Sequence, residues 1–179
     1  RTDTGVHASC IYAHFDLHHS QLEDEHNIVF RLNRFLPDDI AIYRIMPVME
    51  NAHARFDAVS RTYQYRITTL KDPFNRDFAY HVYWPLNIDK MNEVSNILFE
   101  YEDFTSFSKA NTQVKTNRCT IYEANWTQRN HLLIFTVKAN RFLRNMVRAI
   151  VGTMLETGQG KLDIEGFRDI IESRNRSNA

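Results

Sequence analysis

Hydrophobic residues recur with two different spacings along the first half of the chain. Residues 6–17 alternate apolar or small side chains with polar ones, which predicts a strand. Between about residues 21 and 36 the apolar positions recur at helical spacing, and Pro37 ends that pattern. Residues 40–48 are apolar and β-branched and residues 60–69 alternate, so each segment is expected to form a further strand.

The second half of the chain begins with an irregular stretch. Residues 71–85 contain two prolines and many aromatic residues, which indicates a connection and a boundary between two halves. A helix is expected from Asp89, whose side chain is placed to cap the first turn. Two apolar or alternating runs at residues 118–126 and 132–139, separated by a five-residue loop, predict a hairpin.

Two helices are expected after the hairpin. One face of the first carries the apolar or small residues Phe142, Met146, Ala149 and Thr153, and a second stripe carries Arg141, Arg144 and Arg148. The last helix is expected to begin near Asp163 and to bury Phe167 and Ile171. Strands interleaved with helices indicate an α+β fold, in which helices pack on one face of an antiparallel sheet.

Composition places the chain among globular proteins. Its 179 residues are 43% hydrophobic and 12% aromatic, which is enough to bury a sizeable core. Cys10 and Cys119 lie far apart without ligand-like spacing, which argues against a disulfide scaffold or zinc ribbon and favours a reducing cytoplasm. No run of about 18 apolar residues is available to span a bilayer, so no membrane partner is expected.

The distribution of charge changes this picture. The formal net charge is zero, which by itself argues against a nucleic-acid partner. Residues 104–148, however, carry eight basic residues and the single acid Glu123, a net charge of +7. Arginine outnumbers lysine by 16 to 6, and the planar guanidinium suits bidentate contacts with phosphate. A solvated charged face and an RNA-binding surface are both compatible with this pattern.

Three segments combine residue types that carry chemistry. Residues 1–8, Arg-Thr-Asp-Thr-Gly-Val-His-Ala, place the Asp3 carboxylate before a strand, where it is either a turn residue or a reactive group. Residues 54–66 alternate arginine with tyrosine, which offers phosphate contacts beside a stacking ring or else a half-buried sheet pair with extended arginines. Residues 139–152 form either an RNA-facing basic helix or an ordinary amphipathic one.

The three segments occur together, and in this order, in one known family. The chain resembles the bacterial TruA tRNA pseudouridine synthases in RTDTGVHA at residues 1–8, ARFDAVSRTYQY at residues 54–65 and FLRNMVRAIVG at residues 142–152. The run Asp-Phe-Thr-Ser-Phe at residues 103–107 is similar to a further part of the family's pattern. The resemblance therefore covers nearly the whole chain.

The resemblance implies a role for each matching residue. Asp3 is expected to be the nucleophile, attacking either the uracil ring or the ribose C1′, and Arg148 to pair with its carboxylate. Arg1 is expected to help expel the target nucleotide, and Tyr63 to stack on the flipped base. The other substrate-binding residues expected from the motifs are Arg61, Phe142, Arg144 and Met146.

The resemblance also implies a fold, an activity and partners. The fold would consist of two ferredoxin-like or RNP-like halves, a catalytic half at residues 1–75 lacking its opening strands and a second half at residues 76–179 lacking its closing strand. The activity would be isomerisation of uridine to pseudouridine in the anticodon stem-loop of tRNA, at tRNA positions 38–40, by a cytoplasmic homodimer without cofactor or metal. The alternative is a non-catalytic RNA-binding module.

Overall fold

The computed structural model describes residues 5–17, 24–109 and 116–179. By its internal contacts the chain divides into two compact units, Arg1–Asp57 and Ala58–Ala179, which are described separately below.

The first unit contains one helix, α1 (Glu25–Phe35), among its described residues. Asp24 begins it, because its side chain accepts a hydrogen bond from the amide of Asn27 at 2.9 Å. The helix ends where Leu36 turns extended before Pro37, as a residue preceding proline tends to do. The helix expected in this part of the sequence is confirmed.

The strands expected at residues 6–17 and 40–48 are wrong for the described structure, which assigns no strand to either segment. A strand requires a partner backbone to complete its hydrogen-bonded ladder. Ile42 instead bonds to a helix side chain, with its amide donating to Asn33 Oδ1 at 2.7 Å and its carbonyl accepting from Asn33 Nδ2 at 2.8 Å. Alternation could not supply a pairing partner for these segments.

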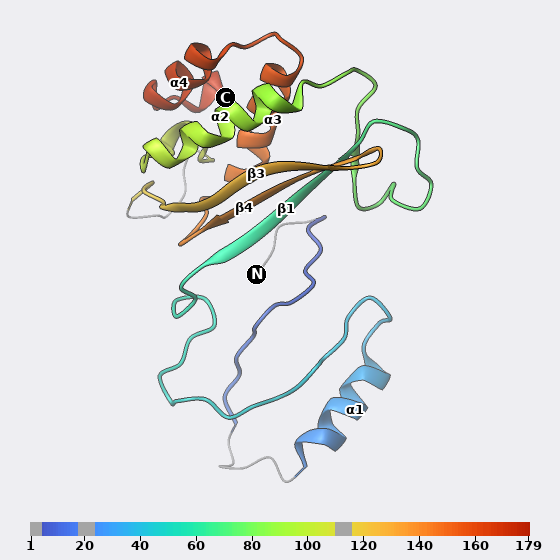
Figure 1. The fold of residues 1–179 in the computed structure, drawn as a ribbon. Helices are drawn as coiled ribbons and strands as arrows, with labels where there is room; N and C mark the ends of the chain where they lie inside the picture. The colour runs from blue at the N-terminus through green and yellow to red at the C-terminus, as the bar shows by residue number, and fades with distance from the viewer. Residues whose placement is uncertain (1–4, 18–23, 110–115) are drawn as a thin grey trace. The chain divides into compact units, whose positions relative to one another are not determined.

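The second unit is built on a four-stranded sheet in the order β2-β1-β4-β3 (Figure 1). Its strands are β1 (Arg61–Thr68), β2 (Tyr80–His81), β3 (Ile121–Arg129) and β4 (Leu132–Ala139). The β1–β4 and β4–β3 pairs are antiparallel, as expected, whereas the short β2 runs parallel to β1. The α+β class is confirmed, but the sheet is mixed at this edge.

The β3–β4 hairpin is tighter than the sequence suggested. Strand β3 continues to Arg129, so that only Asn130 and His131 connect it to β4. Asn130 adopts a left-handed backbone conformation with φ 55°, which asparagine tolerates better than most residues. The expected five-residue loop therefore contains the end of a strand.

Three helices cover one face of this sheet (Figure 1): α2 (Ile88–Ile97), α3 (Met146–Gly158) and α4 (Ile164–Glu172). Asn87 caps α2 by accepting from the amide of Lys90 at 3.0 Å, which corrects the capping role expected for Asp89. Helix α4 begins next to Asp163, as expected, and Asp163 caps it by accepting from the amide of Gly166 at 2.8 Å. Short 3-10 turns, η1 (Leu98–Glu100), η2 (Thr105–Phe107) and η3 (Arg176–Asn178), complete the unit.

The core lies between the sheet and these helices. Trp126 of β3 stacks on Phe135 of β4 with ring centroids 5.0 Å apart. Phe167 of α4 is fully buried and lies 6.2 Å from the ring of Phe107. Burial of Phe167 and Ile171 confirms the apolar face expected for the last helix. Aromatic pairs of this kind add specificity of geometry to the burial of apolar area.

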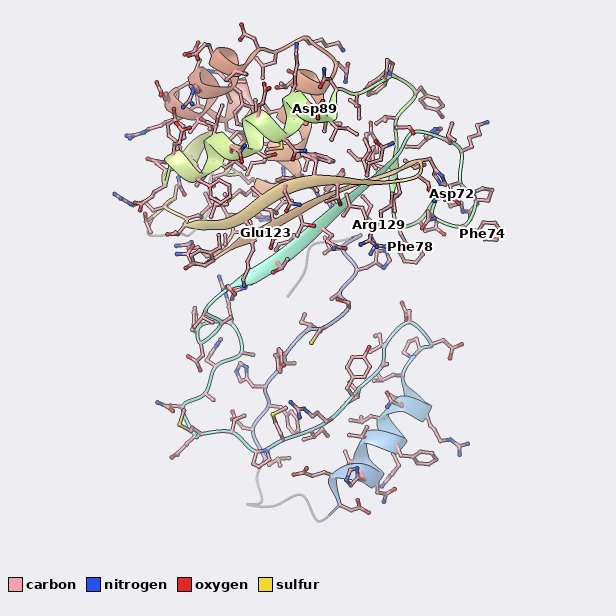
Figure 2. All side chains as sticks on the ribbon, in the orientation of Figure 1. Asp72, Phe74, Phe78, Asp89, Glu123 and Arg129 are labelled. Atoms are coloured by element: carbon pink, nitrogen blue, oxygen red, sulfur yellow. The ribbon has the colours of Figure 1, made fainter. Side chains whose placement is uncertain are left out.

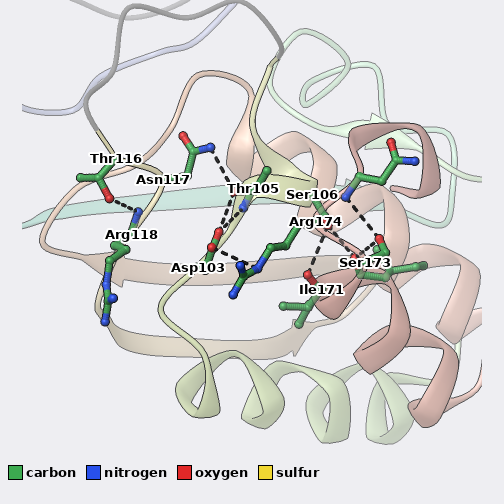
Figure 3. A network of polar contacts seen from close by, with 11 residues as sticks. Asp103, Thr105, Ser106, Thr116, Asn117, Arg118, Ile171, Ser173 and Arg174 are labelled. Atoms are coloured by element: carbon green, nitrogen blue, oxygen red, sulfur yellow. Dashed lines mark hydrogen bonds and ion pairs between the residues drawn. The ribbon is translucent and has the colours of Figure 1, made fainter.

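A polar network holds the Asp-Phe-Thr-Ser-Phe run in place (Figure 3). Asp103 accepts hydrogen bonds from the Thr105 amide at 3.0 Å and the Thr105 hydroxyl at 2.6 Å. Arg174 Nε lies 3.3 Å from the Asp103 carboxylate, and Asn117 Nδ2 donates to the Thr105 hydroxyl at 3.0 Å. Because Phe104 is also fully buried, the run serves to fasten the end of the helical layer to the sheet.

Candidate RNA-modification site

Two of the predicted substrate-binding residues, Arg61 and Tyr63, lie on β1. Arg61, Tyr63 and Tyr65 alternate with exposed residues and are all half-buried. Tyr63 pairs in register with Val137 and Tyr65 with Phe135, so both tyrosines lie on the face of the sheet that carries the core. The shared face expected for the two tyrosines is thus produced by the register of β1 against β4.

Tyr63 has an aromatic neighbour from a distant part of the sequence. Its ring meets the ring of Phe142 edge to face, with centroids 5.0 Å apart and an interplanar angle of 88°. Edge-to-face packing is a favoured arrangement, since the positive ring edge of one partner meets the negative face of the other. Both residues were predicted to bind substrate, and the structure brings them together.

The segment that carries Phe142 is tied to the sheet by Asn140. Its amide donates to Thr120 O at 3.1 Å, and its side-chain oxygen accepts from Thr120 N at 2.9 Å. Arg61 Nη1 donates to the Asn140 carbonyl at 3.4 Å. Sequence reasoning missed Asn140, because its two partners become neighbours only when β3 and β1 flank β4.

Helix α3 starts later than the hydrophobic spacing suggested. Asn145 has a left-handed backbone conformation, with φ 68°, and the helix begins at Met146. Phe142 and Arg144 therefore precede the helix, and the expected arginine stripe is not a helical one. A periodic sequence continues through such a bend, so spacing alone cannot detect it.

The remaining predicted site residues of the second unit differ in solvent exposure. Met146 is fully buried, so its side chain supports the start of α3 from inside the core. Arg144 and Arg148 are exposed, and the backbone carbonyl of Arg144 accepts from Lys109 N at 3.0 Å. Arg148 lies in the first turn of α3. The contacts of these residues with a substrate stay predictions.

Arg148 lies close enough to Tyr65 to affect its acidity. Burial raises the pKa of Tyr65 above its ordinary value of 10.0, the positive charge of Arg148 opposes that rise, and Tyr80 adds to it. The Tyr65 phenol and the Arg148 guanidinium therefore interact electrostatically. The alternation of β1 indicated which face Tyr65 occupies but not its proximity to the helix.

The remaining predicted site residues are Asp3, the expected nucleophile, and Arg1, an expected substrate contact. Arg1 and Asp3 lie outside the described residues.

Within residues 5–17, 24–109 and 116–179, no group of three or more histidine, cysteine, aspartate or glutamate side chains is arranged to hold a metal ion. In the same ranges, no helix has the length and apolar character needed to cross a membrane.

Comparison with known proteins decides the family. The family model described as "tRNA pseudouridine synthase" matches residues 101–179. The chain is 55% identical to tRNA pseudouridine synthase A of Parabacteroides distasonis and 56% identical to that of Bacteroides fragilis, with 100% of this chain and 71% of each relative covered. The chain belongs to the tRNA pseudouridine synthase A family. Tyr63, Arg148 and the segment of residues 1–8 all fall within these alignments.

More distant members of the family align just as completely. The synthase of Bacillus subtilis is 39% identical over 100% of this chain, which covers 72% of that relative. The resemblance seen in the motifs is thereby confirmed, and the chain is a pseudouridine synthase, an isomerase.

Proposed function

We propose that the chain converts uridine to pseudouridine within tRNA, using the Asp3 carboxylate as nucleophile. The observation that carries this proposal is the identity of 55% to 56% with two tRNA pseudouridine synthases A over the whole chain, including residues 1–8. The net reaction breaks the bond between uracil N1 and ribose C1′ and forms a bond from C5 to C1′. C5 loses its proton and N1 gains one, so that no redox partner or group donor is required.

The proposed nucleophile needs a nearby positive charge. A carboxylate removed from water resists ionisation unless a guanidinium or good hydrogen bonds stabilise its charge. Arg148 is the proposed partner of Asp3, because it is exposed in the first turn of α3 and its charge already acts on the neighbouring Tyr65. Asp3 would attack the uracil ring or the ribose C1′, two routes that give the same product.

Tyr63 is proposed to receive the target base. A base stacked in RNA hides its reactive carbons, and turning it out costs a few kcal/mol. Stacking on an aromatic side chain returns about 1–3 kcal/mol of that cost. The edge-to-face contact with Phe142 supports this role, because it restrains the Tyr63 ring from one side. Arg1 is proposed to help expel the target nucleotide, and Arg61 and Arg144 are proposed as further contacts to the substrate.

The finer features of the family are proposed with the activity. They are two ferredoxin-like halves meeting near residues 75–76, a homodimer, a cytoplasmic location and uridines of the anticodon stem-loop, at tRNA positions 38–40, as targets. The four-stranded sheet with helices on one side is consistent with an α+β fold of this kind, and it joins β1 of the first proposed half to β2, β3 and β4 of the second.

Asp3→Asn tests the proposed reaction, because asparagine keeps the shape of the side chain and removes the nucleophilic charge. Release of tritium from tRNA that contains C5-labelled uridine should fall to background in this variant. Binding to the same tRNA should stay within about twofold of wild type. On the scale where 1.4 kcal/mol corresponds to tenfold, this is a change of about 0.4 kcal/mol in the free energy of binding. Asp39→Asn, an exposed aspartate of the first unit, is the control and should release tritium at the wild-type rate.

Two outcomes would contradict the proposal. An active Asp3→Asn variant would exclude Asp3 as nucleophile. A wild-type chain that binds tRNA with steep salt dependence but releases no tritium would indicate the non-catalytic RNA-binding module instead.

A further inference from the structure

The motif Ala-Arg-Phe-Asp at residues 54–57 forms a turn in which two histidine side chains accept hydrogen bonds from backbone amides. Ala54 N donates to His14 Nδ1 at 3.3 Å. Arg55 N and Phe56 N donate to His53 Nδ1 at 3.1 Å and 3.3 Å. Three consecutive amides are thus bound by imidazole nitrogens within the first unit.

Further contacts close the same turn. His53 N donates to Asp57 Oδ2 at 2.7 Å, and His53 O accepts from Phe56 N and Asp57 N, each at 3.0 Å. The His53 ring lies 4.5 Å from the ring of His14 and 4.2 Å from that of Phe56. His53 therefore acts here as asparagine does in an Asx turn, with a ring added that packs against its neighbours.

These hydrogen bonds require one protonation state of the histidines. An imidazole nitrogen accepts only while it carries a lone pair, so Nδ1 must be unprotonated and the ring neutral, with its hydrogen on Nε2. An imidazolium has donors alone and cannot receive the amides. Neutral imidazoles therefore supply part of the hydrogen bonding of the turn, beside the carbonyl of His53 and the carboxylate of Asp57.

The turn presents a cation on an aromatic surface. The guanidinium of Arg55 lies over the ring of Phe56, 5.4 Å from its centroid, and Phe56 is 71% exposed. Arg55 is also exposed. A planar guanidinium held beside a flat ring suits an RNA strand, because it offers forked donors to a phosphate and a surface for a base.

We propose that residues 53–57 form an RNA-contacting turn, in which His53 and His14 as neutral imidazoles position Arg55 to bind a phosphate of the tRNA. The ligand rests on the proposed function, but the contact lies outside the residues assigned to the reaction. His53 is a positioning residue in this arrangement, since it acts through the backbone of Arg55. The turn therefore adds affinity for RNA.

The experiment measures binding of an unmodified tRNA transcript to the whole chain at several salt concentrations. Arg55→Ala should lower the affinity about tenfold and reduce the salt slope by about 1, the effect of losing one phosphate contact. His53→Ala should cause a similar loss of affinity. His53→Asn should keep most of the affinity, because the asparagine side-chain oxygen can accept hydrogen bonds from the backbone amides two and three residues ahead. His26→Ala, at an exposed position of α1, is the matched control and should bind like wild type.

A double variant separates positioning from direct contact. If His53 acts through Arg55, His53→Ala combined with Arg55→Ala should bind no more weakly than Arg55→Ala alone. Additive losses in the double variant, or wild-type binding by Arg55→Ala, would overturn the inference.

The two proposals fail in different ways. Wild-type binding by Arg55→Ala in a chain that still releases tritium from labelled tRNA would remove the turn from RNA recognition and leave the proposed reaction intact. A wild-type chain that neither binds nor modifies tRNA would overturn both. Arg55→Ala keeps every hydrogen bond of the turn backbone, so its result does not depend on whether His53→Ala folds.

Discussion

Tyr63 shows how a single side chain acquires a role from a neighbour far away in the sequence. Its ring is held edge to face by Phe142, which comes from the segment between β4 and α3. Restraining the ring before substrate arrives reduces the conformational entropy that stacking would otherwise cost. The pair is therefore expected to matter both to stability and to the proposed reception of a base.

A double-mutant cycle measures this contact. Tyr63→Leu and Phe142→Leu should each destabilise the chain, and the pair should be coupled by about 0.5–1.5 kcal/mol in urea unfolding. Tyr63→Leu combined with Phe167→Leu is the control, since Phe167 packs elsewhere in the core, and these two changes should add within about 0.5 kcal/mol. Simple additivity for Tyr63 and Phe142 would show that their contact contributes nothing.

The carboxylate of Asp72 is stabilised in its charged form by several hydrogen bonds. His131 Nε2 lies 2.9 Å from Oδ2, and Asn75 Nδ2 donates to the same oxygen at 2.6 Å. Phe74 N and Asn75 N donate to Oδ1 at 3.0 Å and 3.2 Å. These bonds, that from His131 first, lower the pKa of Asp72 from 3.8 to about 2. Figure 2 shows Asp72 and Phe74 in the connection that leads from β1 to β2.

The depressed pKa predicts a loss of stability in acid. Because the folded state holds the Asp72 carboxylate ionised, its contribution is present above pH 3.8 and is lost as the pH falls from 3.8 through about 2. Asp72→Asn should be less stable near neutral pH and should show a flatter stability curve in that window. His131→Ala should remove the largest share of the effect, and His26→Ala should not. Parallel urea-unfolding curves for wild type and Asp72→Asn across the window would contradict this.

At the scale of elements, the start of α3 depends on one backbone conformation. Asn145 at φ 68° turns the chain so that Met146 enters the core while Arg148 remains exposed. A left-handed conformation costs most L-residues about 1–2 kcal/mol, and asparagine and glycine tolerate it best. The element that carries the proposed partner of Asp3 is therefore placed by a residue with no predicted chemistry.

Substitutions at Asn145 separate conformation from side-chain chemistry. Asn145→Ala should destabilise the chain by about 1 kcal/mol, whereas Asn145→Gly should lie within about 0.5 kcal/mol of wild type, because glycine adopts positive φ readily. Urea unfolding measures both. Equal losses for alanine and glycine would indicate that the asparagine side chain, rather than the turn, is what matters.

At the scale of the whole molecule, burial is concentrated in the second unit. The buried hydrophobic residues of the described chain all lie between Ile67 and Ile171. Described residues of the first unit have no buried side chain, and α1 leaves Phe30 60% and Phe35 87% exposed. Local stability follows buried contacts and protected hydrogen bonds, so the two units should differ in how often they open.

Amide hydrogen exchange should display that difference. Amides of β1, β4 and α3 are expected to exchange slowest, near the rate set by global unfolding, and amides of residues 5–17 and 36–57 fastest, with α1 between them. Exchange of the same peptides in denaturant gives the unprotected reference. Equal protection in both units would show that the first unit is held by contacts outside those described.

The amino-acid sequence alone determined the class of fold, the family and several element boundaries. Spacing within a few residues was enough to find α1, β4 and the start of α4 near Asp163, because amphipathic faces depend on neighbours within one or two turns. The three motifs identified the family for a similar reason, since each is a continuous stretch of chain.

Only the tertiary structure decided which segments pair and which side chains meet. Residues 6–17 and 40–48 alternate like strands but form none among the described residues, because a ladder needs a second backbone that alternation cannot specify. The contact of Tyr63 with Phe142, the influence of Arg148 on Tyr65, and the hydrogen bond between Ala54 and His14 all join distant positions. Such contacts arise from strand register and from bends such as Asn145, which a one-dimensional pattern does not record.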